Sequence, residues 1–211
     1  MDAELGRLVR ALRDAGRLDE TLLIVTSDHG EEFLEHGRVL HGATHHAEVL
    51  RVPLLFRGPD IPPGRRVGVP TSLVDVAPTI LGALATPIPE GIDGIDLSPQ
   101  WRDVPPPPPD RPLFSEADNK NVVYDAIRTI RWGRWKLHSH RETQEHALYD
   151  VASDPEERED VAAAHPDTVR RLLGALQAFT GEPGVTAPQL DLTRDERRAL
   201  EALGYLGESP R

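Results

Sequence analysis

The chain has 211 residues, a length that suits one domain, or a domain with a small satellite, and that can bury a hydrophobic core. Its 24 basic and 35 acidic residues give a formal net charge of −11 without any long basic stripe, which argues against a nucleic-acid partner. The absence of cysteine excludes disulfides and thiolate metal sites but fits any compartment. No apolar run approaches the roughly 20 residues of a membrane span, and no signal peptide opens the chain, so the localisation stays unknown.

The first predicted elements are a helix over 2–15 and a strand over 21–26. Apolar residues from Leu5 to Leu12 recur at the spacing i, i+3, i+4, i+7 of an amphipathic helix, and Gly16 follows as a helix end. The next apolar run is rich in β-branched residues and is typical of a strand buried on both faces of a parallel sheet. The chain is therefore expected to begin as an α/β structure.

Asp28 and His29 directly follow this strand, between Ser27 and Gly30. In open α/β sheets ligands bind just beyond the carboxyl ends of the strands. A carboxylate and an imidazole side by side offer an oxygen and a nitrogen to a metal ion, and a glycine lets the backbone turn without strain. Five of the nine histidines lie in the stretch 21–53, namely His29, His36, His41, His45 and His46. This stretch is the predicted centre of any chemistry.

The stretch 31–46 has no regular alternation and is predicted to be a loop. Its glutamates are expected to form a solvated acidic rim, from which one could orient a histidine: Glu31, Glu32 and Glu35. His45 and His46 are expected either to pack within the loop or to support the site residues from behind. A strand over 52–57 follows, and a helix begins after Ser72 with Asp75 as its cap.

The second half of the chain is predicted to be a smaller α+β region. Five consecutive prolines end at Pro109 and form an extended surface connector. Strands are expected over 113–116, 122–128, 129–138 and 147–151, where tryptophan and tyrosine occur, and a helix over 166–179. A last helix begins at Thr193, which forms a capping box with Glu196. We expect three regions: 1–104, a linker over 105–110, and 111–211.

Several motifs in a fixed order resemble the second half of a sulfatase of the alkaline phosphatase superfamily. They are Ser-Asp-His-Gly-Glu-Glu-Phe at 27–33, His-Gly at 41–42 and Glu-Val-Leu-Arg-Val-Pro-Leu at 48–54. The segments 131–137 and 148–157 resemble the small C-terminal sheet of that family. The resemblance covers nearly the whole chain, with one departure, because a Leu-Tyr pair is more usual at the position of His45-His46.

The resemblance implies a fold class and a set of site residues. The fold would be α/β, a partial alkaline-phosphatase-like sheet with packed helices, followed by a small antiparallel sheet subdomain with C-terminal helices. Asp28 and His29 would be metal ligands, and His41 would be a catalytic residue that contacts the substrate anion. His36 is a further candidate for substrate binding. The family points to Ca²⁺, and this donor set also admits Mn²⁺, Mg²⁺ or Zn²⁺.

The family also implies a reaction, the metal-dependent hydrolysis of sulfate esters of small molecules or glycans. Sulfatases carry their nucleophile in a Cys-X-Pro-Ser-Arg or Ser-X-Pro-Ser-Arg motif near the N-terminus, and an Asp-Asp pair supplies further metal ligands. The motif does not occur in these 211 residues. The chain therefore resembles the C-terminal half of such an enzyme, and the isolated chain is predicted to be inactive without the missing N-terminal half.

Two alternatives remain open at this point. A phosphodiesterase or phosphonate monoester hydrolase of the same superfamily shares the Asp-His half-site, and fold alone does not separate sulfate from phosphate. A non-catalytic chain, either a truncated product or a subunit that needs a partner for its nucleophile, would have the same sequence features.

Overall fold

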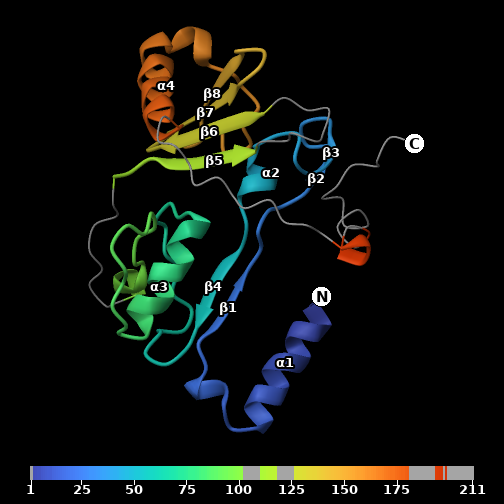
Figure 1. Ribbon diagram of the computed structural model, residues 1–211, viewed down its shortest axis with the longest axis vertical. Coiled ribbons are helices and arrows are strands. Elements are labelled where there is room, and N and C mark those ends of the chain that lie inside the picture. The colour runs from blue at the N-terminus through green and yellow to red at the C-terminus, as the bar shows by residue number, and fades with distance from the viewer. Residues whose placement is uncertain (1, 102–109, 118–125, 181–192, 197, 199–211) are drawn as a thin grey trace. The chain divides into compact units, whose positions relative to one another are not determined.

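The computed structural model describes residues 2–101, 110–117, 126–180, 193–196 and 198 (Figure 1). The chain forms two compact units, one from Met1–Glu31 with Leu50–Leu113 and one from Glu32–Val49 with Phe114–Arg211. The predicted polyproline linker lies almost wholly outside the described residues, as do most of the predicted strand 122–128 and the end of the last predicted helix.

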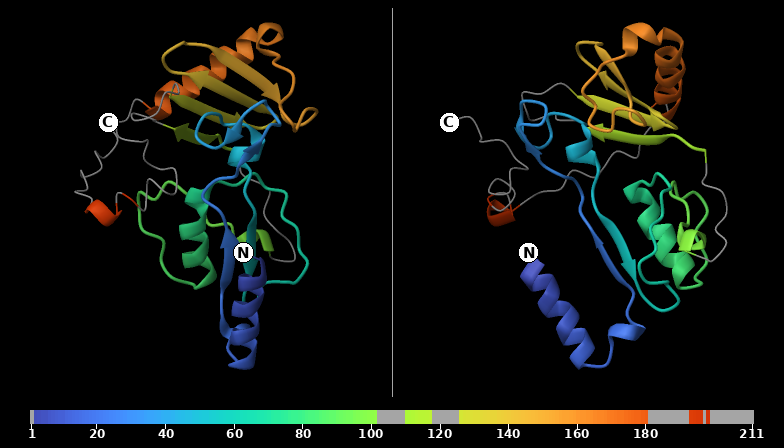
Figure 2. Two further views of the ribbon diagram at one scale, coloured as in Figure 1. Left: turned by 90° about the vertical axis from the view of Figure 1, so that its right-hand side faces the viewer. Right: turned by 180° about the vertical axis from the view of Figure 1, so that it is seen from behind.

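The first unit begins with helix α1 (Asp2–Asp14) and a 3-10 turn (Leu18–Glu20) that leads into strand β1 (Leu23–Thr26). Strand β4 (Leu54–Arg57) pairs with β1, with Leu23 opposite Arg57. Figures 1 and 2 show α1 on one side of this strand pair and α3 on the other. The Arg57 side chain donates hydrogen bonds to the Leu18 carbonyl oxygen and, at 2.6 Å, to Asp19 Oδ1.

The structure corrects the expected environment of β1. The pairing with β4 is antiparallel, whereas a parallel sheet was predicted. The strand is half-buried over Leu23–Val25 and exposed at Thr26, so it is not enclosed on both faces. Among the described residues β4 is its single neighbour, which leaves one edge of β1 without a paired strand. The apolar run thus predicts a strand correctly but its pairing wrongly.

The rest of the first unit is organised around the buried carboxylate of Asp75. This residue closes the 3-10 turn η2 (Leu73–Asp75) that leads into helix α3 (Val76–Ala83). Its side chain is 0% exposed and accepts hydrogen bonds from the backbone N–H of Ser72 at 2.8 Å and of Ile95 at 3.0 Å. Arg111 forms an ion pair with the same carboxylate. Asp75 is thus the third helical residue of a capping box whose N-cap is Ser72, and its side chain does not cap α3 as predicted. Its carboxylate also joins three separate segments.

The second unit contains the hairpin β2 (Glu32–Phe33) and β3 (Val39–Leu40), the short helix α2 (Ala47–Leu50) and a four-stranded sheet. The sheet has the order β5-β6-β7-β8, with bounds Leu113–Ala117, Ile127–Trp132, Trp135–His140 and His146–Asp150. Helix α4 (Pro166–Thr180) covers one face of it (Figures 1 and 2). None of the helices in the described ranges is long and apolar enough to cross a membrane.

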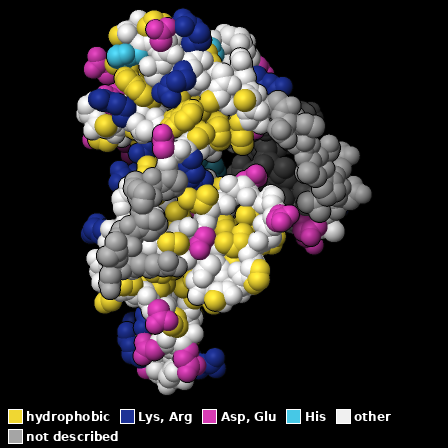
Figure 3. All heavy atoms as spheres, turned by 90° about the vertical axis from the view of Figure 1, so that its left-hand side faces the viewer, with side chains coloured by type: hydrophobic (Ala, Val, Ile, Leu, Met, Phe, Trp, Pro, Cys, Tyr) yellow, Lys and Arg dark blue, Asp and Glu magenta, His cyan; other side chains and the backbone are white. Residues whose placement is uncertain are grey.

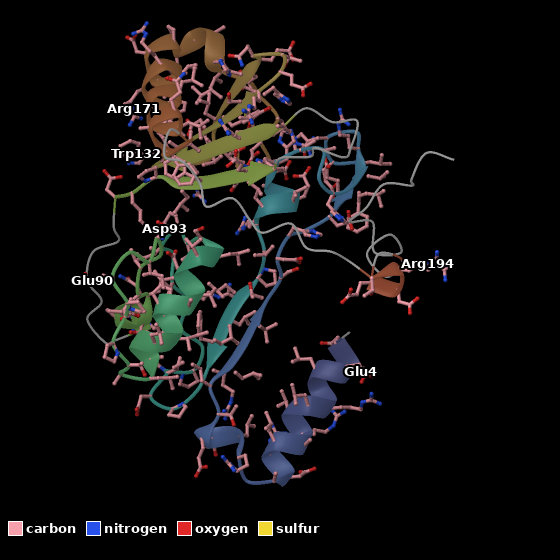
Figure 4. The ribbon with its side chains drawn as sticks, in the orientation of Figure 1. Glu4, Glu90, Asp93, Trp132, Arg171 and Arg194 are labelled. Carbon is pink, nitrogen blue, oxygen red and sulfur yellow. The ribbon has the colours of Figure 1, made fainter. Side chains whose placement is uncertain are left out.

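The core of the second unit lies between α4 and the sheet. Its buried members come from three strands and the helix: Ile130, Leu137, Leu148, Leu172 and Leu176. At the rim of this core the Arg171 guanidinium lies over the Trp132 ring, 5.1 Å from the ring centroid, in an arrangement that favours a cation–π contact (Figure 4). The predicted helix over 166–179 and strand over 147–151 are confirmed to within a residue or two.

The predicted strand over 129–138 is in fact a hairpin. Strand β6 ends at Trp132, and β7 begins at Trp135, directly opposite it in the register. Gly133 has a φ of 61°, a left-handed conformation that glycine adopts without a steric penalty. The two-residue turn at Gly133-Arg134 therefore divides a segment that its composition predicts to be one continuous strand.

We expect Asp75→Ala to lower the free energy of unfolding by about 3–5 kcal/mol, because it leaves Arg111 without its buried partner. The measurement is urea unfolding followed by far-UV circular dichroism. Asp19→Ala is the matched control, since Asp19 also pairs with an arginine but its side chain is 94% exposed, and we expect a small effect. Equal losses in the two variants would contradict the role assigned to Asp75.

Candidate functional site

The turn after β1 sets Asp28 and His29 side by side. Ser27 Oγ donates a hydrogen bond to the His29 carbonyl oxygen at 2.7 Å, and the His29 N–H donates one to Asp28 Oδ1 at 3.0 Å. The Asp28 side chain is 71% exposed and that of His29 is 30% exposed. The turn is thus fixed by local hydrogen bonds while both side chains reach solvent.

The hydrogen bonds of His29 also define its tautomer. The Nδ1 atom lies 2.8 Å from the Gly30 carbonyl oxygen, and because a carbonyl only accepts, Nδ1 carries the proton. In the neutral ring Nε2 then holds the lone pair, and it lies 3.7 Å from Asp28 Oδ2. A backbone carbonyl that orients a histidine in this way is common behind metal ligands. These two residues therefore fit the divalent cation that the sulfatase resemblance implies.

His41 lies in the second unit, in the loop that follows β3. The backbone is left-handed on both sides of it, with φ of 71° at Leu40 and 89° at Gly42. A leucine in this region is uncommon and costs conformational energy, and such residues concentrate at functional loops. The His41 side chain is half-buried. The loop therefore holds His41 in a defined, locally strained conformation.

His36 has protein partners at both ring nitrogens. Its Nδ1 lies 2.5 Å from Glu48 Oε1, and its Nε2 lies 3.2 Å from the Glu157 carbonyl oxygen. Its ring stacks on that of His46 with 3.6 Å between centroids. Burial favours a lower pKa for His36, but the hydrogen bond and the charge of Glu48 outweigh burial and raise the pKa above its ordinary value. His36 is thus firmly oriented within the loop.

A buried cluster of charged and imidazole side chains lies between this loop and the four-stranded sheet of the same unit. We call it the His–Glu–Lys cluster, and its members are His36, His45, His46, Lys136, His138 and Glu157. Lys136 Nζ donates hydrogen bonds to Glu157 Oε1 at 2.6 Å and to the His45 carbonyl oxygen at 2.7 Å. His46 Nδ1 lies 3.1 Å from Glu157 Oε2. The cluster joins segments that are distant in the sequence, and only the sulfatase-like motifs around Lys136 and Glu157 pointed toward it.

Burial and neighbouring charges together set the protonation of the cluster. Burial lowers the pKa of His45 to about 4, an effect that the charge of Lys136 reinforces, so this histidine is neutral and its Nδ1 bonds Thr129 Oγ1 at 2.9 Å. Burial also holds the pKa of His138 well below its usual value. For Glu157 burial would raise the pKa, but the hydrogen bond with His46 and the charge of Lys136 outweigh burial and lower it. The neutral imidazoles of His45 and His138 therefore lie in the same cluster as the ionised carboxylate of Glu157.

The expected acidic rim of the loop is only partly present. Glu35 is exposed, and its Oε2 accepts a hydrogen bond from the Phe33 N–H at 2.5 Å. Glu32 is instead 0% exposed, so its assignment to a solvated rim is wrong. Within the described part of the chain neither of its carboxylate oxygens has a hydrogen-bond partner. The fold of the β2–β3 hairpin turns this side chain inward, which its polar sequence context did not indicate.

Comparisons with known proteins identify relatives of this chain. Residues 1–86 match the Sulfatase family model. Arylsulfatase K of Bos taurus is 32% identical over 198 residues, which cover 88% of this chain and 36% of that protein, and the Xenopus laevis protein is 31% identical over 207 residues. The chain thus spans about a third of the length of these relatives.

Several solved structures share the fold of this chain. A phosphonate monoester hydrolase from Silicibacter pomeroyi superposes with a TM-score of 0.72 at 27% identity, covering 92% of this chain and 42% of that one. The corresponding enzyme of Agrobacterium radiobacter gives a TM-score of 0.70 at 28% identity. A protein solved with D-glucosamine-2-N,6-O-disulfate has the same fold, with a TM-score of 0.69 at 24% identity.

The fold therefore places the chain in the class of α/β proteins of the alkaline-phosphatase type. Within that class, the family match and the arylsulfatase relatives decide the assignment. The chain belongs to the sulfatase family of the alkaline phosphatase superfamily.

We expect Lys136→Met to destabilise the second unit by about 3–5 kcal/mol, because it leaves the buried carboxylate of Glu157 without its ammonium partner. The free energy of unfolding would be measured by urea denaturation followed by tryptophan fluorescence. Arg158→Met is the control, because Arg158 pairs with Glu156 at the surface, with side chains 65% and 68% exposed, and should leave stability unchanged. An unchanged free energy of unfolding in Lys136→Met would show that the Lys136–Glu157 pair contributes no stability.

Proposed function

We propose that this chain supplies part of the active site of a metal-dependent sulfate-ester hydrolase, with Asp28 and His29 as metal ligands. The observation that carries the proposal is the fixed tautomer of His29, whose Nε2 lone pair lies 3.7 Å from Asp28 Oδ2. Membership of the sulfatase family supports the reaction class. Because the chain spans about a third of its relatives, the activity is proposed for a longer protein or an assembly that contains it.

The proposed reaction breaks the bond between sulfur and the bridging oxygen of a sulfate monoester. Water adds to the sulfuryl group, the leaving oxygen takes a proton, and the products are an alcohol and hydrogen sulfate. A bound divalent cation would supply Lewis-acid stabilisation for the negative charge that grows on these oxygens. Asp28 contributes an ionic oxygen ligand, and His29 must be neutral to contribute its nitrogen, so acid should weaken metal binding.

The identity of the metal is part of the proposal. The resemblance to sulfatases points to Ca²⁺, which prefers oxygen ligands, while the imidazole of His29 also admits Mn²⁺, Mg²⁺ or Zn²⁺. The site would use further ligands from outside these 211 residues.

His41 is proposed as the residue that contacts the sulfate anion. A histidine can donate a hydrogen bond to a sulfuryl oxygen or protonate the leaving oxygen, because imidazole changes protonation state near neutral pH. The left-handed backbone on either side of His41 supports a defined orientation. His36, in the same loop, is proposed to assist substrate binding. It would do so mainly by orienting the loop, since both of its ring nitrogens have protein partners.

A phosphonate monoester or phosphodiester substrate is the second candidate. It is favoured by the phosphonate monoester hydrolases of Silicibacter pomeroyi and Agrobacterium radiobacter, which match this chain at 27% and 28% identity. Both kinds of ester are anions cleaved at a tetrahedral centre, so one metal and one anion contact can serve either reaction.

The nucleophile is proposed to come from polypeptide outside these residues. This proposal is supported by large apolar side chains that the described part of the first unit exposes, because a further segment of polypeptide would cover them. These side chains are Leu8, Leu55, Val67, Leu73, Val74, Leu84, Ile88 and Ile92. Hydrophobic side chains are visible over the face of the unit that carries α3 (Figure 3). A second polypeptide that brings the nucleophile would serve the same purpose as a longer chain.

The first test compares this chain with a version extended upstream through a Cys-X-Pro-Ser-Arg region. Both would be assayed on an aryl sulfate and an aryl phosphodiester with added Ca²⁺ or Mn²⁺. We expect turnover only in the extended form, because the nucleophile is absent from the short chain, and we expect Asp28→Ala to abolish it. Asp93→Ala, a change at an exposed aspartate, is the control and should retain activity.

Two results would contradict this proposal. Metal-dependent turnover by the short chain alone would require a nucleophile within these residues. Full activity of Asp28→Ala in the extended form would remove Asp28 from the metal site, and a preference for the diester would favour the second candidate.

In the active, extended form we expect His41→Ala to lower kcat/KM by about 10²–10³, the usual effect of removing one donor to a developing anion. The loss should appear in kcat when the contact is made mainly in the transition state, and steady-state kinetics on the preferred aryl ester would measure it. His165→Ala, at an exposed histidine, is the matched control. Unchanged kinetics in His41→Ala would show that another group contacts the anion.

A further inference from the structure

The His–Glu–Lys cluster contains three side chains whose ligand atoms converge on one point. They belong to His46, His138 and Glu157, each of which offers one ligand atom that lies within 4.8 Å of the other two. The Glu157 oxygen is 3.1 Å from the His46 nitrogen and 3.6 Å from the His138 nitrogen. We propose that His46, His138 and Glu157 bind a divalent ion of the zinc type.

An unsatisfied polar atom supports this proposal independently of the convergence. His138 Nε2 is buried and has no hydrogen-bond partner within the described ranges, and the His138 side chain is 5% exposed. A buried polar atom without a partner is costly, so native structures rarely contain one unless an ion or a water satisfies it. A cation between His138 and Glu157 would satisfy this nitrogen directly.

The spacing fits tetrahedral coordination. Zinc binds imidazole nitrogen and carboxylate oxygen at about 2.0–2.2 Å, which places tetrahedral ligand atoms roughly 3.3–3.6 Å apart. The observed separation of 3.6 Å lies at the upper end of that range, and the separation of 3.1 Å lies just below it. Two imidazoles with one carboxylate suit zinc better than calcium or magnesium, which prefer all-oxygen sites. A water molecule could supply the fourth ligand.

The surrounding charges orient the carboxylate for this role. Lys136 occupies the other oxygen of Glu157 at 2.6 Å and so leaves Oε2 directed at the two imidazoles. The ammonium group opposes a second cation, but Glu48 brings another carboxylate through its hydrogen bond with His36, whose ring stacks on His46. Glu48, which bonds the cluster member His36, and Glu157 thus bring two carboxylates against one ammonium group.

The ligands come from three separate segments of the second unit. His46 directly precedes α2, His138 lies in β7, and Glu157 lies in the turn region after β8. An ion bound to all three would fix the loop that carries His36 and His41 to the four-stranded sheet. We expect this site to be structural, because its ligands are largely buried and hold the loop in place.

The test uses the full 211-residue chain with Asp28→Ala and His29→Ala, which removes the ligands of the proposed catalytic metal. After chelator treatment, the protein is titrated with Zn²⁺ in competition with a chromophoric chelator, and with Co²⁺ followed by visible absorption. We expect one equivalent of metal and the absorption of tetrahedral cobalt. Adding His138→Gln should weaken binding by about 100-fold or more, since even removing a residue behind a ligand costs 10–100-fold. His165→Gln is the matched control.

Binding that is absent, or equal with and without His138→Gln, would overturn the proposal and leave the cluster as a metal-free hydrogen-bonded network. Circular dichroism checks the fold of the His138→Gln protein. An X-ray absorption spectrum of zinc bound to the protein that retains His138 reports the ligands of the metal directly and does not depend on a substitution at His138. Two imidazoles and one carboxylate around zinc are expected, and fewer than two imidazoles would contradict the assignment. Because Asp28 and His29 are absent throughout, the result is separate from the sulfatase proposal.

Discussion

The loop that carries His36 and His41 depends on one buried carboxylate, that of Glu157. This carboxylate bonds Lys136 through one oxygen and His46 through the other, while the Glu157 main-chain carbonyl meets His36. Taking both charges of the Lys136–Glu157 pair out of water is expensive, and the additional hydrogen bonds offset much of that cost. An irregular loop has few backbone bonds of its own, so these side-chain contacts define its conformation.

The first unit uses the same physical device. Asp75 is fully buried and gathers two backbone N–H groups and the Arg111 guanidinium, which tie η2 to segments about 20 and 36 residues away in sequence. In both units a buried acid with several donors replaces regular hydrogen bonding between chain segments. Removing the acid therefore disturbs several segments together, whereas removing an exposed partner disturbs one.

Sequence patterns predicted the features that depend on local spacing. Apolar periodicity located α1 and α4, and the Asp-His motif located a turn whose hydrogen bonds suit metal ligation. The patterns failed where structure depends on residues far apart in sequence. The pairing of β1 and the burial of Glu32 are of this kind, as is the contact between His36 and Glu157, which are 121 positions apart. The hairpin at Gly133 was missed for a local reason, because one left-handed glycine separated two aromatic-rich strands.

The histidine pair at 45 and 46 makes contacts that the Leu-Tyr pair expected from the family resemblance would not make. A leucine in place of His45 would fill a buried position but would leave Thr129 Oγ1 without its imidazole partner. A tyrosine in place of His46 would offer Glu157 only a hydroxyl group, at the far end of the phenol ring. His46 instead brings a ring nitrogen to 3.1 Å from Glu157 and stacks on His36. The departure thus concentrates imidazole nitrogens around one carboxylate, and an ion that prefers nitrogen ligands gains most from that change.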